Sequence, residues 1–290
     1  MANKSPMISR RWLINYVLLL LIIVFTYIGN RYEVQTGYQP KNRISTLKPQ
    51  EIEKVSIQTA DHTLRLSKVG GSWQIDAPIL WVANNIAVER IINIINSETD
   101  SRLPGSEIDL SALGLQFPKA ILKLNNTDFV FGDTNNIGER RYLLTEDTVF
   151  LLADRHLPFM MQGITGFVER RLMPRSIPLQ SLDLGSFRLT QSDSQNWLSN
   201  NPDHSGVQIS ELINNWQTLE AKHLQNYNAQ KTPRQKFIAT LDNGGQIELH
   251  LMTITPDIVI ARPDLGLQYH FDAQHYYGLV TIAKNETPTG

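Results

Sequence analysis

The sequence contains no cysteine, which excludes disulfides, thiolate metal sites and cysteine nucleophiles. It also has no excess of either charge. Its 27 Lys and Arg against 28 Asp and Glu leave a formal net charge of -1, without the basic footprint of a nucleic-acid-binding protein. Serine-hydrolase, zinc-protease, Walker and dinucleotide-binding motifs are missing as well. Because a chain without cysteine fits either redox compartment, its cellular location has to be inferred from another feature.

That feature is an apolar run near the N-terminus, from Trp12 to Ile28. A membrane-spanning helix needs roughly 20 mostly apolar residues, with about 17 as the lower limit. Lys4, Arg10 and Arg11 precede the run with no acidic residue among them, which favours a cytoplasmic tail. The run therefore predicts a single transmembrane helix with the rest of the chain outside the cytoplasm.

A cleavable signal peptide would begin in a similar way. The residues after the run, Ile28 to Tyr32, lack the small-x-small cleavage pattern. We therefore favour an uncleaved signal-anchor over a signal peptide, and either of them over a buried helix of a soluble protein. The prediction is a cytoplasmic tail and anchor over 1–30 in the inner membrane, with the folded region in the periplasm.

The rest of the chain carries a repeated pattern and has room for about two domains. Trp73 precedes Pro78 at the same spacing as Trp197 precedes Pro202, and each proline leads into a run with helical apolar periodicity. Two diverged copies of one fold unit explain the recurrence. The apolar positions of the two runs are Val88, Ile91, Ile92 and Ile95, and then Ile209, Leu212, Ile213, Trp216 and Leu219.

Strand-like alternation surrounds both helical runs. In the first unit it predicts a three-stranded meander ending at Trp73 to Ile75, and later strands around 120–124, 129–131, 142–144 and 149–152. In the second unit, 236–241 matches 119–124, and Asn243-Gly244 is a hairpin turn. The predicted fold class is α+β, with two tandem units, each an antiparallel sheet with helices packed on one side. The predicted boundaries are a tether over 31–49, a first unit over 50–168, a surface connector over 169–178, a second unit over 179–284 and a tail over 285–290.

Three sequence motifs carry a resemblance to a known family. They are Trp73-Gln74-Ile75-Asp76-Ala77-Pro78, then Leu113-Gly114-Leu115-Gln116-Phe117-Pro118, and the glycine turn of Gly132 and Gly138 before the aromatic strand at Tyr142. With them the chain resembles a bacterial domain-of-unknown-function family. The resemblance covers the first unit more closely than the second. It implies a membrane-anchored protein folded outside the cytoplasm, sometimes associated with auxiliary components of gliding-motility-type ABC transport systems, and it supplies no catalytic residues.

Two groups of residues invite a metal-binding interpretation. The segment from Asp133 to Gly138 begins like a calcium loop, but Ile137 and Leu144 stand where the loop needs oxygen ligands, so a hairpin is favoured. The second group is His270, Asp272 and His275. For it, a polar strand edge that runs into a helix cap is the favoured explanation.

Other candidates also have simpler structural explanations. Trp73, Trp197 and Trp216 are expected in the core, with Trp81 as the more exposed aromatic side chain. Ser205, beside His204, has the spacing of a helix cap to Gln208. The clusters Glu139-Arg140-Arg141 and Glu169-Arg170-Arg171 are expected as solvated turns.

We therefore assign no catalytic, cofactor-binding or metal-binding residues from the sequence. The predicted function is non-enzymatic: a membrane-anchored accessory or scaffold protein that contacts a protein partner in an envelope complex, for example one of ABC-type transport. The alternative is an envelope hydrolase acting on glycan or peptide. Acidic side chains from both units meeting in a cleft would favour the hydrolase, and an exposed apolar patch or sheet edge would favour the scaffold.

Overall fold

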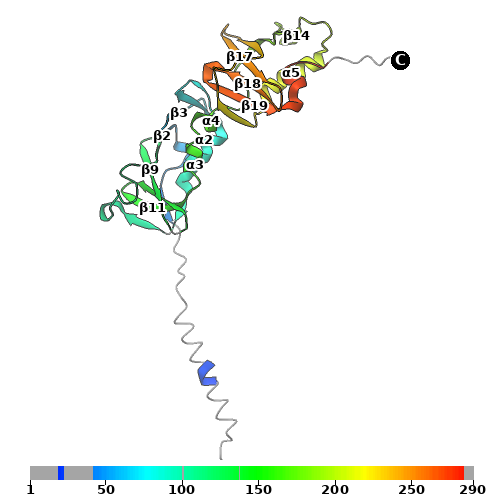
Figure 1. Cartoon of the computed structure of the whole chain (residues 1–290). Coiled ribbons are helices and arrows are strands. Elements are labelled where there is room, and N and C mark those ends of the chain that lie inside the picture. Colours follow the sequence, from blue (N-terminus) through cyan, green and yellow to red (C-terminus); the bar gives the residue numbers. More distant parts are fainter. Residues whose placement is uncertain (1–18, 23–41, 100, 137, 284–290) are drawn as a thin grey trace, which may run out of the picture.

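The computed structural model describes residues 19–22, 42–99, 101–136 and 138–283. These residues form two folded units placed one beyond the other along the molecule (Figure 1). Each unit is built on an antiparallel sheet. Short helices lie between the sheets and beside them, so the two-sheet α+β architecture predicted from the sequence is confirmed.

The described part of the first unit has a nine-stranded sheet in the order β5-β4-β3-β2-β8-β9-β10-β11-β7. The first three of these strands along the chain, β2 to β4, form the predicted meander. In β2 and β3, Val55, Ile57, Leu64 and Leu66 point into the core and alternate with more exposed residues. The strands are β2 (Lys54–Thr59), β3 (Thr63–Val69), β4 (Ser72–Ala77), β5 (Trp81–Val82), β7 (Arg102–Pro104), β8 (Ala120–Leu124), β9 (Thr127–Thr134), β10 (Arg140–Thr145) and β11 (Thr148–Ala153). A separate pair joins β1 (Asn42–Arg43) to β6 (Glu98–Thr99).

The second unit has an eight-stranded sheet among its described residues, in the order β14-β13-β12-β16-β17-β18-β19-β15. The predicted hairpin turn at Asn243-Gly244 joins β16 to β17, and Gly244 has a φ of +80° there, which glycine adopts without a steric cost. The strands are β12 (Leu179–Asp183), β13 (Arg188–Gln191), β14 (Trp197–Ser199), β15 (His223–Asn226), β16 (Gln235–Leu241), β17 (Gln246–Thr253), β18 (Asp257–Arg262) and β19 (Leu267–Asp272).

The two sheets have the same plan. Removing β5 from the first leaves β4-β3-β2-β8-β9-β10-β11-β7, which corresponds strand by strand to β14-β13-β12-β16-β17-β18-β19-β15. In both units a helix follows the first group of strands, α2 after β5 and α5 after β14. The next strand of each large sheet along the chain, β7 or β15, forms its far edge. The topology therefore supports the tandem repeat inferred from the spacing of tryptophan and proline.

The two main helices begin at side-chain caps. In α2 (Asn85–Ile92), Asn84 Oδ1 accepts a hydrogen bond from Ala87 N at 3.1 Å. In α5 (Gly206–Thr218), Ser205 and Gln208 form the predicted capping box. The apolar stripe of each helix is buried, which follows from its helical periodicity.

The remaining helices are single turns. Helix α3 (Leu157–Met160) follows β11, the last strand of the consecutive run from β8 to β11. The short elements are η1 (Pro49–Glu51), η2 (Asn93–Asn96), η3 (Gly105–Glu107), α3 (Leu157–Met160), α4 (Ile164–Phe167), η4 (Pro263–Leu265), η5 (Ala273–His275) and α6 (Tyr276–Leu279).

The tryptophans differ from the prediction in one unit. Trp73 and Trp216 are buried, as expected, but Trp197 is only half-buried and packs against the edge of the core. The short strand β14 lies at the edge of its sheet, so Trp197 has neighbours on fewer sides than Trp73. Trp81, predicted to be more exposed than these core residues, is half-buried and therefore more exposed than Trp73 and Trp216.

The predicted membrane anchor over 1–30 lies outside the described residues, except for 19–22, which are helical. Among the residues that the structure describes, no helix is long and apolar enough to cross a bilayer. The first sheet lies between residues 54 and 153 and the second between 179 and 272, while the finer domain limits stay predictions.

Candidate functional site

The segment that joins the two units is part of the folded core rather than a surface connector. Leu172, Met173 and Pro174 within it are buried. Glu169 N donates to Val82 O of β5 at 3.0 Å, and Ala221 N, just before β15, donates to Arg170 O at 3.0 Å. The connector thus extends from an edge strand of the first sheet to an edge strand of the second. The surface location predicted for 169–178 is wrong for Leu172 to Pro174, which are buried, whereas Arg175, Ser176 and Pro178 are exposed.

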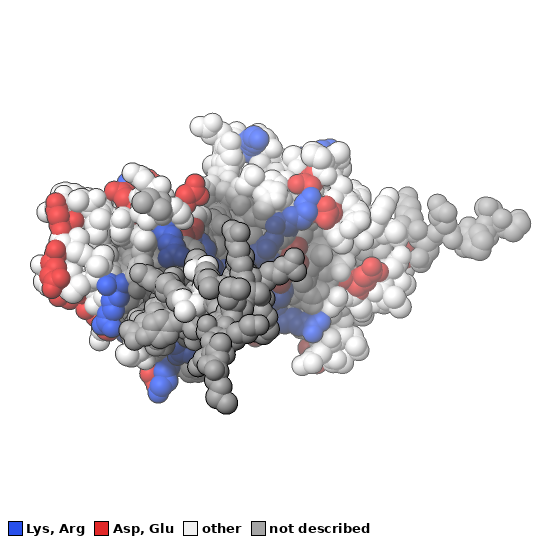
Figure 2. All heavy atoms as spheres, turned by 90° about the horizontal axis from the view of Figure 1, so that it is seen from below, with Lys and Arg blue, Asp and Glu red and all other residues white. Residues whose placement is uncertain are grey.

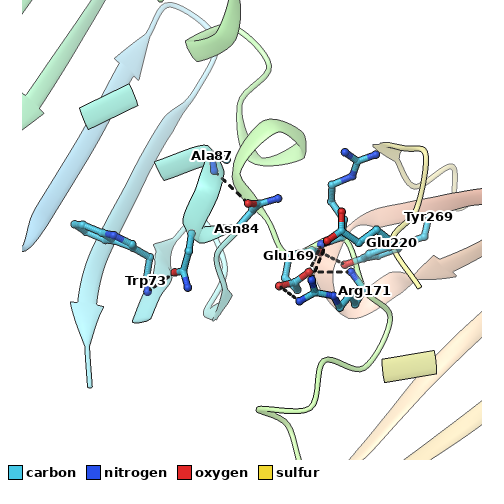
Figure 3. A network of polar contacts seen from close by, with 9 residues as sticks. Trp73, Asn84, Ala87, Glu169, Arg171, Glu220 and Tyr269 are labelled. Atoms are coloured by element: carbon cyan, nitrogen blue, oxygen red, sulfur yellow. Dashed lines mark hydrogen bonds and ion pairs between the residues drawn. The ribbon is translucent and has the colours of Figure 1, made fainter. Parts of the chain in front are cut away.

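An ion-pair network fixes the connector in this position (Figure 3). The Glu169 carboxylate accepts hydrogen bonds from the backbone N–H of Arg170 at 2.8 Å and of Arg171 at 3.2 Å. The Arg171 guanidinium donates to Glu169 at 3.4 Å and to Glu220 at 2.8 Å, which links the connector to the second unit. Tyr269 Oη donates to the carbonyl oxygen of Glu169 at 3.3 Å. The cluster predicted as a solvated turn is therefore a structural joint.

A buried arginine of the second unit completes the joint. The Arg262 side chain is fully buried, and its Nε and Nη2 donate to Asp264 at 2.9 and 2.7 Å. Its Nη1 donates to Leu172 O of the connector at 3.2 Å, and its guanidinium lies 4.3 Å from the ring centroid of Trp81 in the first unit. A single cation thus contacts both units and the connector, with an attraction to the indole face that adds to its hydrogen bonds. Burial also raises the pKa of the nearby Tyr269 hydroxyl, which keeps it a neutral donor.

Two hollows lie beside this joint. The first, here named the apolar groove, has a volume of about 620 Å³, and Val69, Leu80, Trp81 and Ile177 contribute its apolar walls. Leu80 is 71% exposed and Val69 56% exposed. Large apolar side chains at such exposure in a concave surface are typical of a contact site for another molecule.

The second hollow, here named the basic cleft, has a volume of about 510 Å³ and is bounded by both units. The first unit supplies α2 and the α3–α4 region, and the second supplies the start of β15. Basic residues outnumber acidic ones on its walls, since Arg90, Arg170 and Lys222 line it together with a single acidic residue, Glu220. The lining residues used below are Ile86, Arg90, Phe159, Arg170, Lys222 and Leu224.

The histidine cluster considered for metal binding has a different organisation. Lys222 Nζ lies between Asp257 Oδ1 at 2.7 Å and Asp272 Oδ1 at 2.8 Å, where it neutralises the carboxylates that a cation would need. His270 stacks on His223 with ring centroids 4.3 Å apart. Burial, and then the neighbouring His223, lower the pKa of His270, and the hydrogen bonds from Lys222 lower the pKa of Asp257. Within the described ranges, no three histidine or acidic side chains converge on a metal-sized site.

The remaining candidates have structural roles. Asp133 is in β9 and pairs with Lys119 at 3.3 Å, and Asn135 bonds across to Arg140, so this segment is the predicted hairpin. Ile137 lies outside the described residues. In the cluster around Glu139, the solvated-turn prediction is wrong for Arg141, whose largely buried guanidinium pairs with Asp154.

Three carboxylates of the joint are bound by arginine. Glu169 and Glu220 accept hydrogen bonds from Arg171, and Asp264 accepts them from Arg262. Sequence reasoning missed the roles of Arg262 and Arg171. A usable signal was present, because charges at 169–171 are flanked by the apolar residues Phe167, Val168, Leu172 and Met173, a pattern that favours a buried, paired position over a surface one.

Comparison with known proteins places the chain in a family without adding a function. No curated protein matches the sequence, and no solved structure matches it either. A family model described as Domain of unknown function (DUF4340) matches residues 73–243, from the buried tryptophan of the first unit to the hairpin turn of the second. The match spans more than half of the 290 residues. The chain therefore belongs to the DUF4340 family, a domain of unknown function.

Proposed function

We propose that this protein is a non-enzymatic accessory or scaffold subunit that holds a protein partner at the joint between its two units. The observation that supports this proposal is the apolar groove, where Leu80 and Val69 are exposed beside a joint fixed by Arg262 and Glu169. A partner that covers these side chains gains hydrophobic stabilisation. It also binds a preorganised surface, so less conformational entropy is lost on association.

The location completes the proposal. The apolar run over 12–28 and its basic flank support one inner-membrane helix with the folded units in the periplasm. The family resemblance points to an envelope complex of the ABC-transport type as the partner. A hydrolase acting on glycan or peptide is the alternative considered from the sequence. The bonding of Glu169 and Glu220 to Arg171 does not favour it.

The anchor and its orientation are tested first. The full chain should stay with the membrane after a high-salt wash and retain residues 1–30. A reporter that is active only outside the cytoplasm, fused after Gly290, should be active. A soluble mature form beginning near Tyr32, or activity of a cytoplasm-only reporter at the same site, would reject this part of the proposal.

Partner binding is tested by site-specific photo-crosslinking in the native cells. Leu80 is replaced by a photo-reactive amino acid, and Leu103 on β7, which is 51% exposed and lies at the opposite edge of the first sheet, is the matched control. After purification in mild detergent and mass spectrometry, we expect one envelope protein crosslinked at position 80 and not at 103. Equal crosslinking at both positions, or none at position 80, would contradict a partner site in the groove.

A further inference from the structure

We propose that the basic cleft binds an acidic peptide segment of the partner protein, one that places a carboxylate next to an apolar side chain. This inference rests on the proposed scaffold function and assigns it a second contact region. The apolar groove and the basic cleft are separate hollows with different lining residues. The two contacts can therefore be tested independently.

The cleft contains two arginines without carboxylate partners. In the described part of the chain, no acidic side chain forms an ion pair with Arg90 or Arg170, and Glu220 is already bound by Arg171. Lys222 is not counted, because Asp257 and Asp272 neutralise it. Arg90 on α2 therefore has its guanidinium left for an anionic ligand, and guanidinium binds carboxylate with paired, charge-assisted hydrogen bonds. Arg170 of the connector, whose Nη2 is bonded to backbone carbonyls, adds positive charge to the wall of the cleft.

Both arginines are held in place before any ligand arrives. Arg170 Nη2 donates to the carbonyl oxygens of Ala221 and Lys222, and its Nε is buried without a partner in the described structure. The Arg90 guanidinium lies 5.4 Å from the ring centroid of Phe159, and this ring packs on Phe167 at 4.7 Å. A preorganised cation loses little entropy when it binds, which strengthens recognition.

The shape and chemistry of the cleft favour a peptide over a small inorganic anion. Its volume of about 510 Å³ is in the range of pockets for organic ligands and far exceeds the space that one phosphate needs. Ile86, which is 72% exposed, together with Phe159 and Leu224, gives it apolar walls beside the two arginines. Seen from below, Lys and Arg side chains lie on both sides of the middle of the molecule, and a group of Asp and Glu side chains lies along one edge (Figure 2).

Binding is measured on the full chain in mild detergent, by fluorescence anisotropy of a labelled peptide of alternating glutamate and leucine. A peptide with lysine in place of glutamate is the probe control. We expect saturable binding of the acidic peptide alone, weakened about tenfold or more by Arg90→Glu, because each charge-assisted hydrogen bond contributes substantially. Raising the salt concentration from roughly 0.05 to 0.5 M should weaken it as well. Arg65→Glu, an exposed arginine on β3 outside the cleft, should leave binding unchanged.

Several outcomes would overturn the inference. Equal effects of Arg90→Glu and Arg65→Glu, or no binding of the acidic peptide, would remove the cleft as its site. Inorganic phosphate that binds where the peptide does not would show a small-anion site instead. If Leu80 still crosslinks a partner in these cases, the cleft assignment fails and the scaffold function stands. If position 80 no longer crosslinks a partner while the acidic peptide still binds, the cleft is a peptide site and the scaffold function fails.

Discussion

The two units share a strand order but differ in where they bury their large aromatic side chain. The first unit buries Trp73 on the strand β4, whereas the second buries Trp216 on the helix α5 and leaves Trp197 on β14 half-buried. Trp216 fills its position with Nε1 donating to Leu279 O at 2.9 Å. The two units therefore keep the same arrangement of strands, but a different element supplies the large side chain between sheet and helix. Either solution fills the core, and a core has to be filled to nearly constant packing density.

The units differ again at the joint. The first sheet has an extra edge strand, β5, which has no counterpart in the second sheet among the described residues. The connector pairs with this strand, and Trp81 on it receives the Arg262 cation. An asymmetry between two otherwise equivalent sheets thus creates the surface on which the units are joined.

The largest expected effect tests the difference in the aromatic core. We expect Trp216→Ala to lower the free energy of unfolding by about 3 to 5 kcal/mol, because a fully buried ring is lost and a cavity remains. Trp73→Ala should cost a similar amount in the first unit. Urea unfolding of the full chain in detergent, followed by circular dichroism, measures both. A variant of either residue with wild-type stability would mean that its unit has a different core.

The second largest expected loss of stability is at the joint. We expect Arg262→Met to cost about 2 to 3 kcal/mol, because Leu172 O loses its donor and Trp81 loses its cation. Amide hydrogen exchange around Leu172 should also become faster. Arg188→Met, which removes an exposed pair with Asp183, is the matched control and should cost at most about 1 kcal/mol. Equal costs for the two variants would show that the buried cation does not stabilise the joint.

A smaller effect sharpens the comparison of the repeated tryptophans. We expect Trp197→Ala to cost about 1 to 2 kcal/mol, less than Trp73→Ala, because part of the Trp197 ring is already in contact with water. The same unfolding measurement compares the two variants directly. A loss for Trp197→Ala as large as that for Trp73→Ala would restore the two residues as equivalent core anchors.

The last expected effect concerns pH. Burial, followed by the charge of Arg155, lowers the pKa of His156 to about 4. The unfolded chain, with a histidine pKa of about 6.5, therefore binds more protons than the folded protein between these values, and stability falls as the pH drops from about 6.5 to about 4. His156→Gln should reduce this dependence when urea midpoints at about pH 7 and pH 4.5 are compared. His275→Gln, at the corresponding position of the second unit, is the matched substitution, and an unchanged pH dependence in His156→Gln would contradict the assignment.

Much of the architecture follows from local sequence patterns. Apolar strand patterns predict β2, β3, β8 to β11 and β16, helical stripes predict α2 and α5, and the capping box at Ser205 marks a helix start. These features are short-range, because the side-chain periods of strand and helix are fixed by backbone geometry. The repeated spacing of tryptophan and proline also predicted two units with one plan.

The joint could not be predicted in this way. Arg262 and Leu172 are 90 residues apart, and Tyr269 and Glu169 are 100 apart, so no local period connects them. A charged residue next to apolar ones is compatible with a surface turn or with a buried ion pair, and only the presence of a partner distinguishes these cases. The sequence by itself determined the long central strands, the two main helices and the repeat. Tertiary structure decided the burial of the connector, the half-exposure of Trp197 and the pairing of Arg262, because these depend on which distant groups meet when the two sheets pack.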